Sequence, residues 1–402
     1  MTHMLDAFLR GFALPAAAIL VVAGCAELPP KAAAPACPAC AECQQCPAPA
    51  RAAEPRYQLT PFAAIPGWQV AAFAPGVRAF AAGCPRVAQS NPLRRACDKL
   101  LAEPPGDEPA ARQFIETSFS AWAVSSAEGV AEGLITGYYE PVLPGSRVRT
   151  ERFRHPVYGV PDDLIAVDLE SVNPELKGMR LRGRLEGNRL LPYLSRAEIE
   201  SRAPFRAPVL AWVEDPVELF FLQIQGSGQI ELESGARLRL GYGDQNGHPY
   251  RSMGRYLMQR GELALEQTSM QGIKAWAAAN PRKLREALDA NPSYVFFRPM
   301  PDSPGGPVGT LGAPLSAGYS LAIDPRSVPL GAPVFLATTM PLSSQPLHRL
   351  MAAQDTGGAI RGAVRADFYW GTGADAGTLA GRMRQQGRMW ILWPGGEPLP
   401  KP

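Results

Sequence analysis

The sequence predicts a mainly β protein with flanking helices, in which two β segments are separated by a helical stretch. Short apolar runs recur from Gly133 onward, and glycine and proline interrupt them at short intervals. Helical spacing of apolar residues is confined to a few stretches. The frequent interruption favours an antiparallel sheet or a barrel over alternating strand–helix units. A chain of 402 residues has material for about two or three domains.

The composition excludes several classes of protein. Glycine (39 residues) and proline (42 residues) are frequent, but they stay below the share of about 25–30% that is typical of disordered chains. The net charge of +3 is too small to indicate a nucleic-acid partner. The four histidines do not form an H-E-x-x-H motif, so zinc-protease chemistry is not expected. We expect no metal and no cofactor.

Residues 1–24 are typical of a bacterial signal peptide. The apolar run at residues 11–24 (GFALPAAAILVVAG) is too short to span a membrane. The sequence VAGC at residues 22–25 resembles the lipobox of bacterial lipoproteins, in which the cysteine receives the lipid. We therefore expect lipidation of Cys25; a secretory signal with a chance cysteine is the alternative. Because alanine and not aspartate follows Cys25, we expect an outer-membrane lipoprotein that faces the periplasm.

Residues 25–56 are rich in alanine and proline, which is typical of a linker. This lipid-anchored linker contains four evenly spaced cysteines: Cys37, Cys40, Cys43 and Cys46. The spacing resembles an iron–sulfur or metal tract. An oxidising compartment and the lack of apolar neighbours favour disulfides over metal. The role of the four cysteines stays open.

Two further cysteines, Cys84 and Cys97, lie in a stretch with helical spacing of apolar residues. In an oxidising compartment we expect them to form a disulfide. Two buried thiols are the alternative.

The segment at residues 218–228 (ELFFLQIQGSG) is interpreted as a β-strand with a glycine-rich end. Gln223 and Gln225 would then share one face, where their amides could bind hydroxyl and acetamido groups. The glycines on either side of Ser227 would let a ligand approach the backbone closely, or would form a plain bulge.

Three aspartates stand out in the last β segment. Asp324 precedes proline and Asp355 precedes Thr-Gly-Gly, so each could serve a turn. Asp367 lies in a strand whose residues alternate, with Arg365, Asp367 and Tyr369 on one face. That face fits either a solvated strand or a carbohydrate groove. The single Asp-Thr-Gly does not indicate an aspartic protease, which needs two such loops.

Several motifs together carry a resemblance to a known family. They are GLITGYYEP at residues 133–141, FFLQIQGSG at 220–228, GYGDQNGHPYR at 241–251, NPSYVFF at 291–297 and the three aspartates. In this order they resemble the MltA-type family, the membrane-bound lytic murein transglycosylases A, with its C-terminal 3D domain. The resemblance implies a double-psi β-barrel domain from residues 57–137 and 263–402. It also implies an inserted β domain at residues 138–262 and a substrate groove between the two.

The resemblance also implies a reaction. The β-1,4 bond between N-acetylmuramic acid and N-acetylglucosamine is cleaved without water, and a 1,6-anhydro-muramyl end remains. Because the substrate's own C6 hydroxyl attacks, one carboxylate can act first as acid and then as base. By motif position this residue is Asp367, Asp355 orients or stabilises the transition state, and Asp324 supports a barrel loop. A peptidoglycan hydrolase (muramidase) and a non-catalytic cell-wall-binding lipoprotein are the alternatives.

Substrate contacts are expected from aromatic, amide and backbone groups near these motifs. The candidates are Tyr138, Tyr139, Gln223, Gln225, Ser227, Gly357, Gly358, Arg361 and Tyr369. The expected partners are peptidoglycan glycan strands and the outer membrane, which the lipid anchor would enter. Other wall-remodelling proteins are further candidates.

Overall fold

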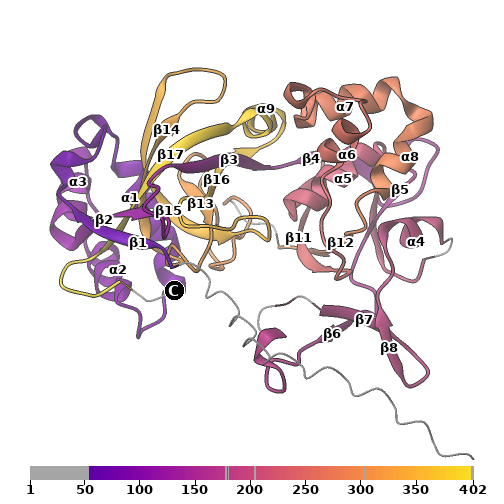
Figure 1. Cartoon of the computed structure of the whole chain (residues 1–402), viewed down its shortest axis with the longest axis horizontal. Coiled ribbons are helices and arrows are strands. Elements are labelled where there is room, and N and C mark those ends of the chain that lie inside the picture. The colour runs from indigo at the N-terminus through magenta and orange to yellow at the C-terminus, as the bar shows by residue number, and fades with distance from the viewer. Residues whose placement is uncertain (1–53, 177–178, 180, 203–204, 302–304, 400–402) are drawn as a thin grey trace, which may run out of the picture. The chain divides into compact units, whose positions relative to one another are not determined.

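The computed structural model describes residues 54–176, 179, 181–202, 205–301 and 305–399. The expected signal peptide, the lipidated Cys25 and the four linker cysteines (Cys37, Cys40, Cys43 and Cys46) lie outside the described residues. Within the described part, strands outnumber helices (Figure 1). The predicted class, mainly β with flanking helices, is confirmed.

The larger sheet is formed by strands from both ends of the described chain. They are β1 (Arg56–Thr60), β2 (Phe119–Ser125), β3 (Gly133–Glu140), β13 (Ser320–Ile323), β14 (Pro333–Thr339), β15 (Pro346–Thr356), β16 (Ala366–Thr372) and β17 (Arg384–Pro394). The order is β1-β2-β17-β14-β15-β13-β16-β3. β17 pairs with β3 as well as with β14. The strands β17, β14, β15, β13, β16 and β3 therefore form a closed barrel, because the last of them pairs with the first. A closed barrel has no free strand edge.

Two strand pairs in the barrel are parallel. β3 runs parallel to β16, and β13 runs parallel to β15. β13 also pairs antiparallel with β16, so it lies between β15 and β16. This mixed arrangement accords with the expected double-psi barrel and brings the three aspartate-bearing segments side by side.

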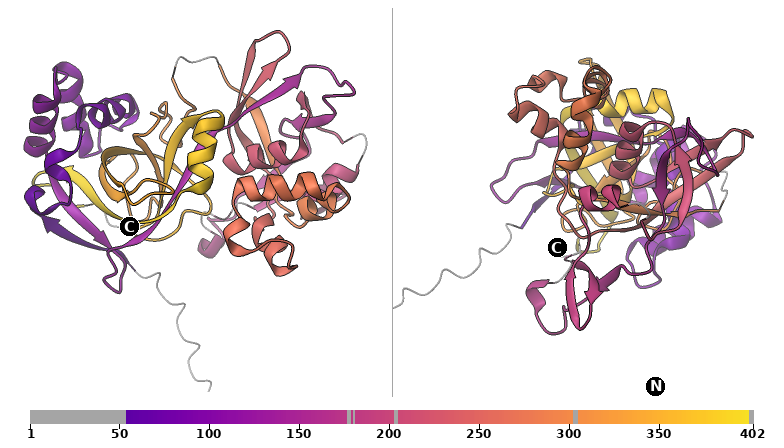
Figure 2. Two further views of the ribbon diagram at one scale, coloured as in Figure 1. Left: turned by 90° about the horizontal axis from the view of Figure 1, so that it is seen from above. Right: turned by 90° about the vertical axis from the view of Figure 1, so that its right-hand side faces the viewer.

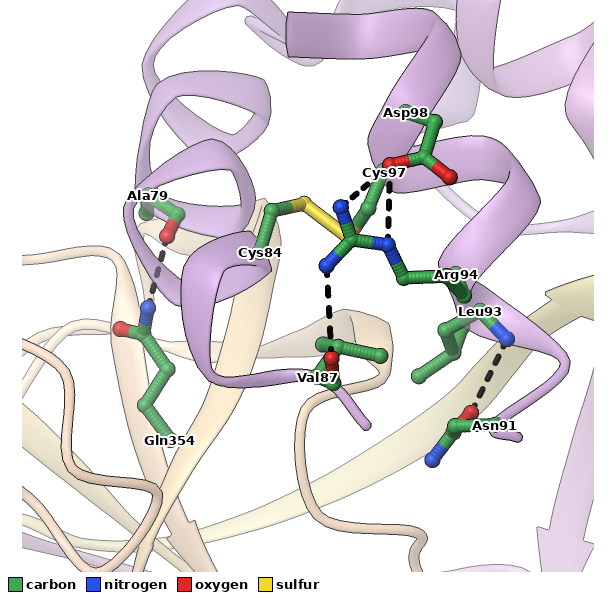
Figure 3. Close-up of a disulfide and its surroundings, with 9 residues drawn as sticks. All are labelled: Ala79, Cys84, Val87, Asn91, Leu93, Arg94, Cys97, Asp98 and Gln354. Atoms are coloured by element: carbon green, nitrogen blue, oxygen red, sulfur yellow. Dashed lines mark hydrogen bonds and ion pairs between the residues drawn. A yellow bond between two sulfur atoms is a disulfide. The ribbon is translucent and has the colours of Figure 1, made fainter. Parts of the chain in front are cut away.

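Three helices pack against the barrel: α1 (Ala74–Gly83), α2 (Leu93–Ala102) and α3 (Glu108–Ser118) (Figure 1). At Gly76, an added Cβ would lie 2.3 Å from the carbonyl oxygen of Leu350, so glycine allows α1 to approach β15 closely. Gln354 of β15 donates a 2.7 Å hydrogen bond to the carbonyl of Ala79 (Figure 3). These contacts hold α1 against β15, the strand that carries Asp355.

The predicted disulfide is present. Cys84 and Cys97 are bonded to each other and fully buried. Figure 3 shows that it joins the end of α1 to α2, beside the ion pair of Arg94 with Asp98. The bond therefore links two of the helices that cover the barrel.

A second sheet is formed by residues from the middle of the chain. Its strands are β4 (Val142–Ser146), β5 (His155–Tyr158), β9 (Val209–Val213), β10 (Gly228–Leu232), β11 (Arg237–Gln245) and β12 (Val295–Pro299). The order is β12-β11-β10-β4-β9-β5. Since β12 pairs with β11, this sheet extends past the predicted boundary at residue 262. The other boundary, at residue 138, falls inside barrel strand β3.

Helices and a small third sheet accompany the second sheet. The helices are α4 (Arg196–Ser201), α5 (Pro216–Gln225), α6 (Met253–Gln259), α7 (Met270–Ala279) and α8 (Pro281–Asp289). The third sheet contains β6 (Ile165–Val167), β7 (Leu181–Glu186) and β8 (Arg189–Pro192). Helices α5 to α8 share one apolar core, and Figure 2 shows α6, α7 and α8 grouped together. No helix in the described part is long and apolar enough to cross a membrane.

The prediction of a strand at residues 218–228 is wrong, because most of this segment is helix α5. Asp215 caps the helix by accepting a 2.7 Å hydrogen bond from the amide of Val217, and Pro216 follows as the first helical residue. Gly226 ends the helix with a φ of 76°. Together they supply the start and stop signals of a helix. The apolar run is buried on more than one side of α5, which explains why it lacks clear helical periodicity.

Candidate active site

The parallel pair β3–β16 brings together residues that are about 230 positions apart in the chain. Asp367 lies opposite Thr136, and Tyr369 lies opposite Tyr138. Side chains alternate along a strand, so Thr136 and Tyr138 share one face of β3, and Asp367 and Tyr369 share one face of β16. The predicted alternation in β16 is confirmed at Ala366 and Phe368, which are fully buried, and at Asp367, which is partly exposed. It is wrong for the next two residues, since Tyr369 is buried and Trp370 is partly exposed.

Asp367 is held through one of its two carboxylate oxygens. Oδ1 accepts hydrogen bonds from the Thr136 hydroxyl and from the Arg365 guanidinium. Arg365 also donates to the Thr136 hydroxyl at 3.0 Å and to the carbonyl of Ala366 at 2.7 Å. Among the described residues, no group donates to Oδ2 of Asp367. The carboxylate is therefore fixed in place with one oxygen available.

Asp355 is the second-to-last residue of strand β15 and is more strongly enclosed. Its Oδ1 accepts 2.9 Å hydrogen bonds from the amide and hydroxyl of Thr310 and from the amide of Thr356. Burial raises the pKa of Asp355, and these donors offset only part of the effect. Asp355 therefore keeps its proton to a higher pH than an ordinary aspartate does.

The two carboxylates lie on either side of β13. Asp355 and Asp367 both stand opposite Ala322 in the strand register. Adjacent strands are separated by about 4.8 Å, which puts the two α-carbons about 10 Å apart.

Tyr138 connects the two aspartates. Burial first, and then the negative charges of Asp355 and Asp367, raise the pKa of Tyr138 far above its ordinary value. Its ring lies 5.2 Å from that of Tyr369, between centroids. The buried hydroxyl of Tyr138 completes no hydrogen bond with the described residues. The Asp355 carboxylate is the candidate acceptor of this neutral donor, and a bound ligand would offer it another.

Asp324 lies outside this group and holds a loop. Its carboxylate is buried and accepts hydrogen bonds from the Arg326 guanidinium at 2.7 and 3.0 Å. It also accepts a 2.9 Å bond from the amide of Gly362. Burial alone would raise the pKa of Asp324, but these bonds outweigh it and lower the pKa. Since Gly362 belongs to the loop between β15 and β16, Asp324 fixes the connection between the other two aspartates.

Two of the predicted substrate contacts lie away from the aspartates. Tyr139 is buried on the opposite face of β3, where helix α9 (Ala374–Arg382) covers it. A Cβ added at Gly377 of α9 would lie 2.8 Å from the Tyr139 ring. Gln223 is buried in α5, and its Oε1 accepts a 2.6 Å hydrogen bond from Arg196. Both residues therefore have structural partners, and for them too substrate binding stays a prediction.

The other predicted contacts occupy loops and a helix end. Gln225, the last residue of α5, accepts a 3.3 Å hydrogen bond from the amide of Tyr139, and Ser227 follows in the turn before β10. Gly357, Gly358 and Arg361 lie in the loop between β15 and β16. Arg361 is exposed and donates to the carbonyl of Ile360 at 3.3 Å. For these residues substrate binding stays a prediction.

Sequence reasoning missed several residues of the site. Thr136 and Glu140 alternate with Tyr138 in the motif at residues 133–141, so the period of two was a usable signal for both. Glu140 is buried and accepts 2.8 Å hydrogen bonds from Gln229 and Thr372. Thr310 carries no comparable signal, because only the fold brings its loop to Asp355.

A closed barrel that brings two aspartates and a tyrosine hydroxyl together has the groups that a carboxylate-dependent enzyme uses, and glycan cleavage is one reaction of this class. Comparison with known proteins identifies the family within this class. Residues 134–298 match the model of the MltA specific insert domain, and residues 319–393 match that of the 3D domain. A sequence relative, membrane-bound lytic murein transglycosylase A of Escherichia coli K12, is 34% identical over 313 residues, which is 76% of each chain.

Solved structures agree with the sequence relatives. A crystal structure of MltA from Neisseria gonorrhoeae is 42% identical and covers 86% of this chain and 94% of its own, with a TM-score of 0.76. The structure of E. coli MltA with bound chitohexaose is 31% identical and covers 80% and 89%, with a TM-score of 0.61. The chain therefore belongs to the membrane-bound lytic murein transglycosylase A family, and it is a peptidoglycan lytic transglycosylase.

Proposed function

We propose that the enzyme cleaves the β-1,4 bond between N-acetylmuramic acid and N-acetylglucosamine without water, with Asp367 as its single acid and base. The observation that carries this proposal is the geometry of Asp367, whose Oδ1 is held by Thr136 and Arg365 while Oδ2 receives no bond from a described residue. An oxygen fixed in this way can reach the glycosidic oxygen of a bound strand.

In the first step the protonated carboxyl of Asp367 gives its proton to the departing glycosidic oxygen. Positive charge then develops at C1 of the muramic acid residue. In the second step the Asp367 carboxylate removes the proton of the C6 hydroxyl, and O6 attacks C1 to form the 1,6-anhydro ring. The Arg365 guanidinium compensates the negative charge that Asp367 carries between the two steps.

Asp355 and Tyr138 are assigned to the transition state. An ionised Asp355, about 10 Å away at the backbone, would stabilise positive charge at C1. The Tyr138 hydroxyl, which no described residue satisfies, would donate to a substrate oxygen.

A hydrolytic reaction is the second candidate. It is favoured by one observation, the raised pKa of Asp355. With Asp355 as a second working carboxyl group, a water molecule could replace the C6 hydroxyl as nucleophile. The products then carry a reducing muramic acid end.

We further propose that Cys25 anchors the enzyme in the outer membrane on its periplasmic face. The lipobox-like residues 22–25 support this location, and so does the description of the E. coli K12 relative as membrane-bound. Residues 25–56 would then connect the anchor to the barrel.

The test is digestion of purified peptidoglycan by the full-length protein in detergent, followed by mass spectrometry of the muropeptides. Products lighter by one water than reducing muropeptides are expected from the wild type and not from Asp367→Asn. The control Asp375→Asn changes an exposed aspartate of α9 and should leave the products unchanged. Reducing ends would support the hydrolase, and full activity of Asp367→Asn would refute the single-acid mechanism.

A further inference from the structure

A hollow of about 690 Å³ lies farther along the strand that carries Asp367. Its polar and aromatic lining comes from β10, β11 and β16 and comprises Gln229, Arg237, Arg239, Tyr369 and Thr372. Tyr369 and Thr372 are two and five residues beyond Asp367. At about 3.3 Å per residue, the hollow begins about 7 Å from Asp367 and extends to about 16 Å along the strand.

The charged residues among the described lining of the hollow are two arginines. They alternate on β11, so they point to the same face of the strand. Arg239 is largely buried, donates to the carbonyl of Gly305 at 2.8 Å and lies 3.7 Å from the buried carboxylate of Glu140. Glu231 stands opposite Arg237 in the strand register but does not line the hollow, so the charged side chains in its described lining are both cationic.

Arg237 is the more available of the two arginines. It is exposed, and among the described residues its hydrogen-bond partner is Gln229, whose Oε1 accepts a 3.2 Å bond. Gln229 in turn donates a 2.8 Å bond to Glu140 and is itself buried. The buried pair thus orients the guanidinium of Arg237, and a planar guanidinium is suited to bidentate binding of a carboxylate.

We propose that this hollow binds a carboxylate of the peptide attached to the muramic acid residue, with Arg237 as the main contact. The inference rests on the proposed function, because it needs the C1 atom of that residue beside Asp367. In murein the lactyl group of muramic acid carries a short peptide with free carboxylates. A peptide that starts beside Asp367 reaches 7–16 Å within about two to five extended residues. Without the peptide, the anion of a muramic acid residue is the carboxylate of its own lactyl group, which stays on the sugar and does not extend along β16.

The test compares two substrates, glycan strands that retain their peptides and the same strands after an amidase has removed the peptides. For the full-length Arg237→Gln variant we expect kcat/KM on the peptide-bearing strands to fall about tenfold, mainly through a higher KM. On the stripped strands, whose freed lactyl carboxylates stay on the sugar and short of the hollow, we expect no change. The matched control Arg282→Gln, which alters an exposed arginine of α8, should leave both values unchanged.

Equal losses on both substrates would mean that Arg237 contacts the sugar or its lactyl carboxylate and not the peptide, and the proposal would be overturned. No loss on either substrate would overturn it as well. Equilibrium binding of the two kinds of strand to wild type and variant separates this proposal from the proposed function. If the wild type does not cleave the strands, the proposed function fails, while an Arg237-dependent preference for peptide-bearing strands would still support the carboxylate site.

Discussion

We predict that Asp324→Ala destabilises the barrel and weakens catalysis although Asp324 lies outside the group of site residues. The side chain is 1% exposed and accepts hydrogen bonds from Arg326 and from the amide of Gly362. The change removes the acceptors and leaves the loop between β15 and β16 without this attachment. Because that loop joins Asp355 to Asp367, its loosening should reduce the turnover rate.

The size of the effect follows from the surroundings of each partner. The Arg326 side chain is 59% exposed, so it regains water, and loss of the ion pair costs only about 1 kcal/mol. Loss of the charge-assisted bond from the Gly362 amide costs about 1.5 kcal/mol. We therefore expect the free energy of unfolding to fall by about 2–3 kcal/mol.

The assay is urea unfolding of the full-length protein followed by tryptophan fluorescence, together with turnover measured well below the unfolding midpoint. Asp98→Ala is the matched control, since Asp98 also pairs with an arginine but is 56% exposed; a change below about 0.5 kcal/mol is expected there. A loss under about 1 kcal/mol for Asp324→Ala would refute the reasoning.

The pH dependence of the same variant provides an independent check. The folded protein lowers the pKa of Asp324 below its ordinary value of 3.8. The contribution of Asp324 to stability is therefore fully present above that ordinary value, and it is lost as the pH falls through the lower, folded pKa. The difference in stability between wild type and Asp324→Ala should be constant near neutral pH and should shrink in strong acid. A difference that grows in acid would contradict the assigned contacts.

Three further predictions concern the site and its supporting helices. Asp355→Asn should stabilise the fold at neutral pH, because the raised pKa means that the charged carboxylate destabilises the folded protein. The gain should vanish below about pH 4, where the wild-type carboxyl is protonated in the folded and the unfolded protein. Urea unfolding at neutral and at acidic pH checks this. Thr136→Val removes a donor to the candidate acid and should lower kcat about tenfold with little change in KM; an unchanged kcat would exclude a role in positioning. Replacement of Cys84 and Cys97 by serine opens a loop whose ends are 13 residues apart and should cost about 3 kcal/mol; urea unfolding should show the loss without reductant, and the variant should not respond to reductant.

The fold class and the central carboxylates were predictable because both depend on local patterns. Alternation along residues 364–370 marked Asp367 as a polar residue of a half-buried strand, and the structure confirms β16 there. The proline and glycine around Asp324 and Asp355 correctly suggested turns after β13 and β15. An alternating strand or a turn can be recognised from a few neighbouring residues of the sequence.

The errors arose where tertiary contacts decide the outcome. Tyr138 and Tyr139 look equivalent in the sequence, yet α9 covers one of them and Asp355 lies beside the other. The segment that became α5 is apolar on more than one side, so its period carried little information and only the capping residues identify the helix. The pairing of β12 with β11 is a long-range contact without a local signal.

The parallel contact between β3 and β16 has a consequence for the order in which the protein becomes active. Thr136 and Asp367 are 231 residues apart, and β17, which pairs with both β3 and β14, is the last strand of the barrel. A chain interrupted before Asp367 therefore has no carboxylate beside Thr136, and on the proposed mechanism we expect it not to cut a glycan strand. If Asp367 acts as proposed, lytic capacity appears only after β17 has been synthesised and the barrel has closed, and fragments that lack β16 or β17 are expected to leave the wall intact.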